Sequence, residues 1–166
     1  AMSVRKIIPW PNTCLRTAAA QVSEITDEIR GLWDDMIDTM DAMPGVGLAA
    51  PQIGVMLQVA VVDASQGRNK RIRLANPVIL DASAILNEHD EASPNLPGVS
   101  AMVKRPRGVT VRYLDENGVV TRRDFVGLEA TSVQHQIDHL AGKMYFDNLS
   151  KTRRDMLLRK ARKFKG

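Results

Sequence analysis

The chain has 166 residues, enough to bury a core of its own, and a near-balanced net charge of +4. A hydrophobic content of 44% and a charged content of 25% exclude an intrinsically disordered chain. The single cysteine, Cys14, excludes an internal disulfide framework and fits a reducing compartment, and aromatic residues at 4% argue against stacking platforms for single-stranded nucleic acid.

The N-terminal segment AMSVRKIIPW lacks the long apolar run of a signal peptide. The most apolar stretch, residues 46–64, is interrupted by Pro51, Gln52 and Asp63. It is better explained as a buried loop followed by a core strand than as a membrane span. We therefore expect a cytoplasmic protein with no membrane partner.

Residues 22–40 carry apolar side chains at a helical period, and Ser23 or Thr26 could cap the start of this predicted helix. Residues 43–54 are rich in glycine and proline and are expected to form a loop. Residues 58–64 are short, β-branched and bounded by turn residues, which predicts a strand.

Residues 71–80 suggest a further strand, broken before Pro77. Residues 81–98 are polar and irregular, so we expect a surface loop there. Residues 109–127 form the clearest hairpin pattern in the chain, because two β-rich runs flank an Asn-Gly pair at positions 117–118.

Residues 128–142 predict a helix with Val133, Ile137 and Leu140 on one face and Gly142 as its C-terminal stop. A basic helix at about 150–164 is expected to follow. The order of helix, strands, hairpin, helix and basic helix argues for a single α+β domain covering residues 1–166.

The tail from Lys151 to Gly166 carries a charge of +7, which leaves −3 for the rest of the chain. Leu157, Ala161 and Phe164 form an apolar stripe along it. One interpretation is a terminal helix that docks through this stripe and exposes a solvated basic face. The other is an electrostatic contact with an RNA-rich surface such as the ribosome.

Two histidines, His135 and His139, stand four residues apart in the predicted helix. At about 100° per residue their imidazoles lie roughly 40° apart around the axis, so both can reach one divalent metal ion. Gln136 lies beside His135. The spacing alone is a weak signal, since such pairs arise by chance.

With HQIDHLAG and VKRP, the stretch GVGLAAPQ (residues 45–52) resembles the peptide deformylases. That family carries G-x-G-L-A-A-P-Q, then E-G-C-L-S, then H-E-x-D-H-L-x-G. The first motif is intact here, and the third has Gln136 in the place of the glutamate. The resemblance implies a peptide deformylase-like α+β fold, with mixed or antiparallel strands around a central helix bearing the histidine pair.

The second motif departs most from the family. The stretch EASPN, residues 91–95, occupies its place. Glu91 matches, whereas Ser93 replaces the metal-binding cysteine. Ala92, Pro94 and Asn95 also differ, which indicates natural divergence rather than two isolated near-isosteric substitutions.

The resemblance implies metal-dependent hydrolysis of the N-formyl group from the N-terminal methionine of nascent peptides. The metal is iron in the family, with zinc or nickel as alternatives. The implied metal ligands are His135, His139 and Ser93. The implied catalytic positions are Gln136, Gln52 and Gly47. The implied substrate-binding residues are Gly45, Val46, Gly47, Pro94, Asn95 and Leu96.

The substitutions oppose this chemistry. A neutral serine hydroxyl is a far weaker ligand than a thiolate, and the amide of Gln136 cannot accept the proton that a glutamate accepts. Pro94 also removes a backbone N–H where substrate would be held. A positioned acid–base group is typically worth about 10²–10⁴ in rate. We therefore expect weak or absent deformylase activity.

Three hypotheses follow. The first is a non-catalytic protein that binds formyl-Met or Met peptide N-termini in the cleft and the ribosome through its basic helix. The second is a slow metal hydrolase, in which a carboxylate of Glu88, Asp90 or Glu91 enters the coordination sphere. Against that, Glu91 is expected to pair with Arg105 as loop support. The third is a structural subunit with no ligand in the cleft.

Overall fold

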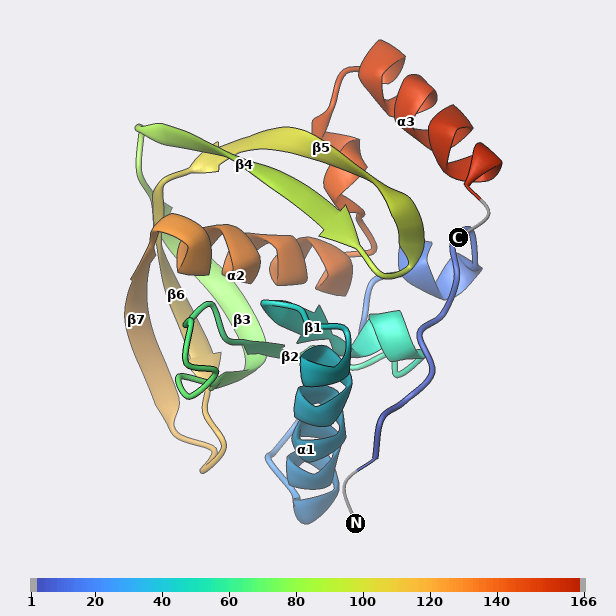
Figure 1. Cartoon of the computed structure of the whole chain (residues 1–166). Coiled ribbons are helices and arrows are strands. Elements are labelled where there is room, and N and C mark those ends of the chain that lie inside the picture. Colours follow the sequence, from blue (N-terminus) through green and yellow to red (C-terminus); the bar gives the residue numbers. More distant parts are fainter. Residues whose placement is uncertain (1–2, 165–166) are drawn as a thin grey trace.

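In the computed structural model of the chain, which describes residues 3–164, one helix lies between two antiparallel sheets (Figure 1). The larger sheet has the strand order β1-β2-β3-β6-β7, and the smaller pairs β4 with β5. The strands are β1 (Gly47–Ala49), β2 (Val59–Val62), β3 (Ile72–Ala82), β4 (Leu86–Ser93), β5 (Leu96–Pro106), β6 (Gly108–Leu114) and β7 (Val120–Val126). The helices are α1 (Asp27–Ala42), α2 (Gly127–Leu140) and α3 (Lys151–Lys163), with short 3-10 helices η1 (Thr13–Arg16), η2 (Ala50–Ile53) and η3 (Tyr145–Asn148).

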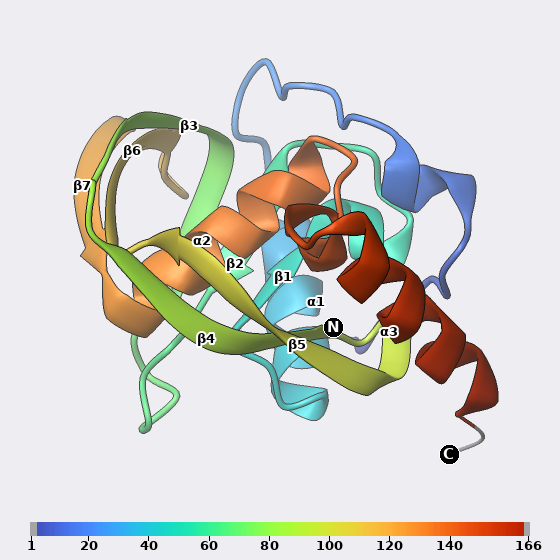
Figure 2. The ribbon, with the colours of Figure 1, turned by 90° about the horizontal axis from the view of Figure 1, so that it is seen from above.

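The central element is α2, which contacts strands of both sheets and is buried along most of its length. The sheet β4–β5 crosses over one side of α2, and the larger sheet covers another (Figures 1 and 2). This arrangement confirms the predicted α+β class with strands around a central helix. It explains the weak amphipathic pattern of α2, since a helix covered on several sides needs small or polar groups that find partners inside.

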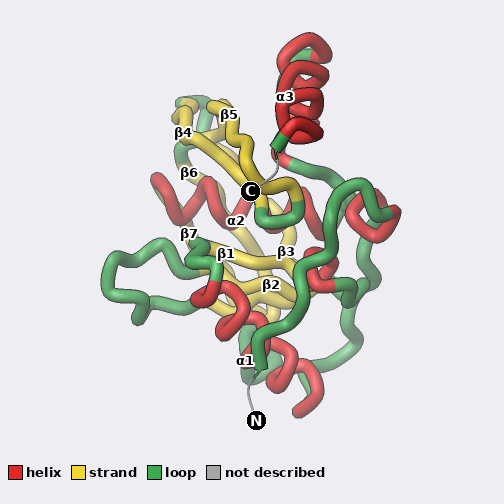
Figure 3. The backbone as a smooth tube through the Cα atoms, turned by 45° about the vertical axis from the view of Figure 1, so that its right-hand side comes forward, coloured by secondary structure: helices red, strands yellow, loops and turns green. Residues whose placement is uncertain are grey.

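Two outer helices complete the packing, and they lie at opposite ends of the molecule (Figure 3). Helix α1 packs on β2, where the fully buried Trp33 donates from Nε1 to the Ala60 carbonyl at 2.9 Å. Helix α3 runs beside β5 (Figure 2) and docks through Leu157, which is 7% exposed. The predicted docking of the tail by its apolar stripe is thus confirmed for Leu157; Lys165 and Gly166 lie outside the described residues.

Several expected boundaries are confirmed. Thr26 caps α1, its side chain accepting from the backbone N–H of Ile29 at 3.3 Å. The hairpin β6–β7 turns at Gly118, which adopts a φ of 75°. Helix α2 ends before Gly142, whose φ is 79°.

Three local predictions were wrong. Residues 81–98 are not a surface loop, because they contain β4 and the start of β5. Strand β4 is polar because its inward side chains form hydrogen bonds with α2 and β5 instead of entering an apolar core. Strand β3 continues through Pro77 by a register shift, with Asn76 at a φ of 49° and bonded to Val22. The glycine- and proline-rich segment contains β1 and η2.

Within residues 3–164, no helix combines the length and the apolar character needed to cross a membrane.

Strand β1 passes very close to α2 at Gly47. A Cβ on this glycine would lie 2.4 Å from Nε2 of Gln136 and 2.6 Å from Oγ of Ser132. The Ser132 hydroxyl donates to the Val46 carbonyl at 2.9 Å and so holds the two elements together. The absence of a side chain at position 47 therefore sets the distance between β1 and the helix.

The N-terminal segment is bound to α1 through Asp35. Its carboxylate accepts from the backbone N–H of Ser3 at 3.1 Å and from Nε of Arg5 at 2.8 Å. Thr39 accepts from the backbone N–H of Arg5 at 2.8 Å. The hydrogen bond from Arg5, which outweighs the effect of burial, holds the pKa of Asp35 below its ordinary value.

We predict that Gly47→Ala lowers the free energy of unfolding by about 1–3 kcal/mol, because the new methyl group must displace the buried Gln136 side chain. The matched control is Gly31→Ala in α1, where a Cβ meets nothing within 4 Å. That change should raise the free energy of unfolding by about 0.5–1 kcal/mol. Urea denaturation measures both, and equal effects would contradict the close approach.

We predict that Asp35→Asn lowers the free energy of unfolding at pH 7 by about 0.5–1 kcal/mol, a small value because Arg5 is partly exposed. The pKa of Asp35 is lowered by folding. Its contribution to the free energy of unfolding is therefore present above about pH 4 and is lost as the pH falls through the folded-state pKa. Urea denaturation at pH 7 and pH 3 should therefore show a smaller deficit at pH 3 than at pH 7. Asp38→Asn, on the same helix without an ion pair in residues 3–164, is the control.

Candidate functional site

A cleft of about 400 Å³ opens beside α2, between the segment leading into β1 and the end of β4. The segment before β1 supplies Met43, Pro44 and Val46 to an apolar wall, to which Leu128 of α2 also contributes. Chemically active groups lie at its base. The predicted site residues that line the cleft are Gly45, Val46, Gly47, Gln52, Ser93, Pro94, His135 and Gln136.

The two histidines of α2 converge on each other. Nε2 of His135 and Nε2 of His139 are 3.1 Å apart. Nδ1 of His135 is 2.8 Å from a carboxylate oxygen of Glu91, which assigns the ring proton to Nδ1 and leaves Nε2 of His135 free to accept. The pair can share a hydrogen bond, or present two imidazole nitrogens to one cation.

Glu91 also forms a buried ion pair across the small sheet. The guanidinium of Arg105 donates to both carboxylate oxygens, at 2.7 and 3.0 Å, and to Asp138 of α2 at 2.9 Å. Burial alone would raise the pKa of Glu91, but the hydrogen bonds from His135 and Arg105 outweigh it and hold the pKa below its ordinary value. The expected pairing of Glu91 with Arg105 is confirmed, while its contact with His135 was not foreseen from the sequence.

His139 lies behind His135 and does not line the cleft. It is 1% exposed, and burial, with the nearby His135 and Arg105, holds its pKa well below the ordinary value. His139 is therefore neutral near pH 7. Its Nδ1 is buried without a hydrogen-bond partner among the described residues. Tyr145 stacks on His135 at 5.9 Å between ring centroids and fixes the plane of that imidazole.

Ser93, Gln52 and Asn95 form a closed hydrogen-bonded triangle at the base of the cleft. The Ser93 hydroxyl donates to Oδ1 of Asn95 at 2.8 Å and accepts from Nε2 of Gln52 at 3.3 Å. Gln52 also donates to Oδ1 of Asn95 at 2.7 Å, while its own Oε1 accepts from the Ala49 N–H. All three side chains are nearly fully buried, so the Ser93 hydroxyl is already engaged on both sides.

Gln136 is 4% exposed, and its side-chain amide lies against Gly47. Its Oε1 is buried and has no hydrogen-bond partner among residues 3–164. An unpartnered acceptor at the base of a cleft is a position where a bound molecule gains by donating a hydrogen bond. An amide here can orient such a donor but cannot remove its proton.

The side chains at the base of the cleft provide an incomplete ligand set for a metal ion. No group of three or more His, Cys, Asp or Glu side chains in the described part of the chain could hold one. The convergence of the two Nε2 atoms fits two ligands of a divalent ion. The third position offers only the neutral, engaged hydroxyl of Ser93. The residues present therefore fit a tightly held catalytic ion incompletely.

Two predicted substrate-binding residues lie outside the cleft lining. Asn95 is 1% exposed behind Ser93, and it holds the N-terminal segment by donating to the Ile8 carbonyl at 2.6 Å. Leu96 belongs to the apolar core that α3 covers. The apolar wall, Met43 and Leu128 above all, was missed because isolated apolar residues in a loop or a first helical turn carry no sequence signal for a cleft.

Comparisons with known proteins agree with this geometry. The family model described as "Polypeptide deformylase" matches residues 4–155. The peptide deformylase of Pelagibacter ubique (strain HTCC1062) is 41% identical over 167 residues, covering 99% of this chain and 97% of its own. The crystal structure of a peptide deformylase from Legionella pneumophila superposes with a TM-score of 0.91 at 39% identity, covering 98% of this chain and 95% of its own.

A second crystal structure, peptide deformylase from Ehrlichia chaffeensis in complex with actinonin, has a TM-score of 0.91 at 34% identity and covers 98% of both chains. Matches of this extent cover the central helix, both sheets and the cleft between them. The chain therefore belongs to the peptide deformylase family.

Proposed function

We propose that this chain uses the cleft of a peptide deformylase to bind peptide N-termini and hydrolyses their formyl group weakly or not at all. The observation that carries this proposal is the triangle of Ser93, Gln52 and Asn95. The family pattern has a thiolate at position 93. Here the position holds a hydroxyl whose hydrogen bonds are complete within the protein.

The metal chemistry of the family is not matched by the residues present. Peptide deformylases are metal-dependent enzymes. Such an ion activates a water molecule when it is held firmly by its ligands. His135 and His139 would hold it here, but the third protein ligand is neutral and engaged. Glu91 is not a substitute, since both of its oxygens are bonded to Arg105 and one also to His135.

Gln136 supports the same conclusion about hydrolysis. A general base must accept a proton within hydrogen-bond distance of the nucleophile. The amide of Gln136 has no basic atom, and no acidic side chain of α2 lines the cleft. Its unpartnered Oε1 can still accept a hydrogen bond, for which the amide or ammonium of a peptide N-terminus provides a donor.

The binding part of the proposal is supported by the cleft itself. Peptide deformylases act on the N-termini of nascent peptides. The wall of Met43, Val46 and Leu128 suits an apolar, flexible side chain such as that of methionine. Gln52, in contrast, has no free N–H to donate to a formyl or carbonyl oxygen, because its amide nitrogen already donates to Ser93 and Asn95.

A slow metal hydrolase is the second candidate. It is favoured by the two converging Nε2 atoms and by Asp90, an exposed carboxylate in the cleft lining that a weakly held ion could recruit. We also propose that the protein acts in the cytoplasm and that residues 1–166 form one domain. Its basic helix α3 would contact the ribosome through exposed residues such as Arg162.

We predict that the purified chain, supplied with iron, nickel or zinc, deformylates a formyl-Met tripeptide at a rate near background. Ser93→Cys should raise the metal content toward one ion per chain, because a thiolate replaces a neutral hydroxyl. Adding Gln136→Glu should raise turnover by about 10²-fold or more. Elemental analysis and a coupled formate assay measure the two effects.

The control for the added thiol is Ser83→Cys, at an exposed position outside the cleft. This variant should change neither metal content nor turnover. Rapid turnover by the unmodified chain would contradict the proposal and support the metal hydrolase.

We predict that a Met-Ala-Ser tripeptide binds the unmodified chain. Leu128→Glu should raise the Kd of this peptide about 10-fold or more, because burial of a methionine side chain contributes about 1.5–3 kcal/mol. Val120→Glu, on the exposed edge of β7, is the matched control. Isothermal titration calorimetry gives both affinities. An equal loss in the two variants, or no binding at millimolar peptide, would contradict the assignment of the cleft.

A further inference from the structure

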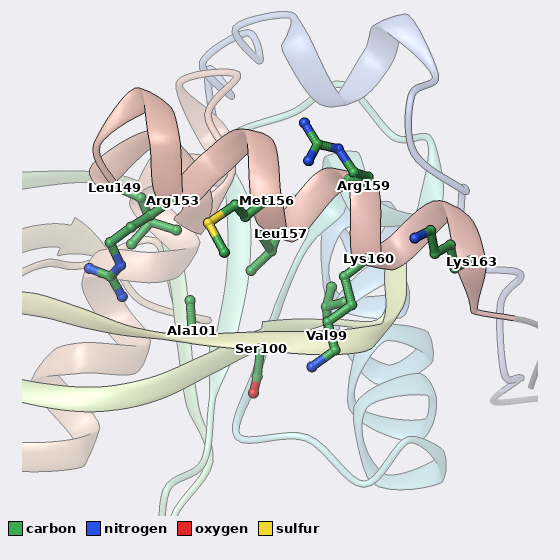
Figure 4. Close-up of a pocket in the computed structure, with 10 residues that line it drawn as sticks. All are labelled: Val99, Ser100, Ala101, Leu149, Arg153, Met156, Leu157, Arg159, Lys160 and Lys163. Carbon is green, nitrogen blue, oxygen red and sulfur yellow. The ribbon is translucent and has the colours of Figure 1, made fainter.

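A second hollow lies on the outer side of the small sheet, away from α2. This groove, of about 460 Å³, runs between β5 and α3 (Figure 4). In the described part of the chain, its lining comes from residues 99–101 of β5 and from the segment from Leu149 to Lys163. It shares no residue with the cleft beside α2, so the role of that cleft does not account for it.

The groove has an apolar floor. Val99 and Ala101 of β5 face Leu157 of α3, and Met156 lies beside them (Figure 4). Met156 is 61% exposed, which leaves a flexible thioether available for contact with a bound apolar group. A groove that bound only phosphate groups would gain nothing from these side chains.

The lining of the groove includes four basic side chains, Arg153, Arg159, Lys160 and Lys163. Arg153 lies at one end, while Lys160 reaches down toward Val99 and Lys163 lies beyond it at the other (Figure 4). Among residues 3–164, no carboxylate contributes to the lining. Within residues 3–164, no acidic side chain forms an ion pair with Arg153, Lys160 or Lys163. Two basic ends therefore bracket an apolar centre.

The groove also borders an open strand edge. In the described chain, β5 pairs only with β4. Arg153 donates to the Met102 carbonyl at 3.1 Å, so this carbonyl faces α3 and is already bonded there. An extended segment lying in the groove can bond only to the other outward backbone groups of this edge, as in β-strand addition.

From these three features we propose that the groove between β5 and α3 binds a short acidic segment of a partner protein, in which one or two bulky apolar side chains are flanked by carboxylates. The apolar side chains occupy the floor over Ala101 and Met156, and the carboxylates meet Arg153 and Lys160. An extended backbone supplies the complement to the β5 edge. RNA would pair with the basic side chains but would leave the apolar floor without a partner.

The test is selection of a random nonapeptide library against the full chain, followed by affinity measurement on the selected peptides. The selected sequences should carry carboxylates on both sides of an apolar residue. Lys160→Glu should weaken their binding by about tenfold or more. Arg162→Glu, the same charge reversal on the same helix outside the groove lining, should have an effect of less than about threefold.

Met156→Ser separates the apolar floor from the charge. It should weaken the selected peptides about fivefold without altering binding of a nine-nucleotide RNA. RNA binding that falls equally in Lys160→Glu and Arg162→Glu, and does not respond to Met156→Ser, supports the assignment. Selected peptides that bind Lys160→Glu or Met156→Ser as tightly as the unmodified chain overturn it. The assignment is also overturned if RNA competes with the selected peptides and its binding depends on Lys160 and Met156 as theirs does. Thermal melts of each variant establish that it is folded.

Discussion

The buried ion pair of Arg105 and Glu91 joins the small sheet to α2 through its further bonds to His135 and Asp138. Glu91 lies on β4, Arg105 on β5 and their further partners His135 and Asp138 on α2. Removing one partner of such a group leaves the other charge buried and uncompensated. The small sheet, the central helix and the orientation of the first histidine are therefore fixed by one set of charge-assisted hydrogen bonds. The cleft depends on it because its base and one of its walls come from these three elements.

Much of the fold could be predicted from the sequence, because periodicity and turn chemistry act locally. The helix capped by Thr26, the hairpin at Gly118 and the helix ended by Gly142 each carry their own signal. Strand β4 could not be found in this way, since its inward residues are polar. Their partners lie on α2 and β5, more than ten residues away along the chain, and a pattern read from one segment does not contain them.

The site was predictable to the extent that motif positions carry chemistry. The histidine pair and Gln52 were assigned from their motifs, and the structure brings them to one place. The sequence also showed that Ser93 and Asn95 differ from the family pattern, but it could not show that the two side chains bond to each other. In the structure Asn95 accepts the Ser93 hydroxyl and ties it to Gln52. The two substituted residues therefore form one hydrogen-bonded unit, in which the buried side chain of Asn95 finds its partners.

The ties between the N-terminal segment and the base of the cleft have a consequence for how the chain folds. Ile8 bonds to the backbone of Gln52 and to the side chain of Asn95, and Trp10 donates to the Asn95 carbonyl. These partners are 40 to 90 residues away, and the central helix they surround begins only at Gly127. Contacts of such long sequence separation slow folding, since chain entropy is lost before they form. During synthesis, Ile8 and Trp10 therefore lack these partners until the segment around Asn95 has left the ribosome.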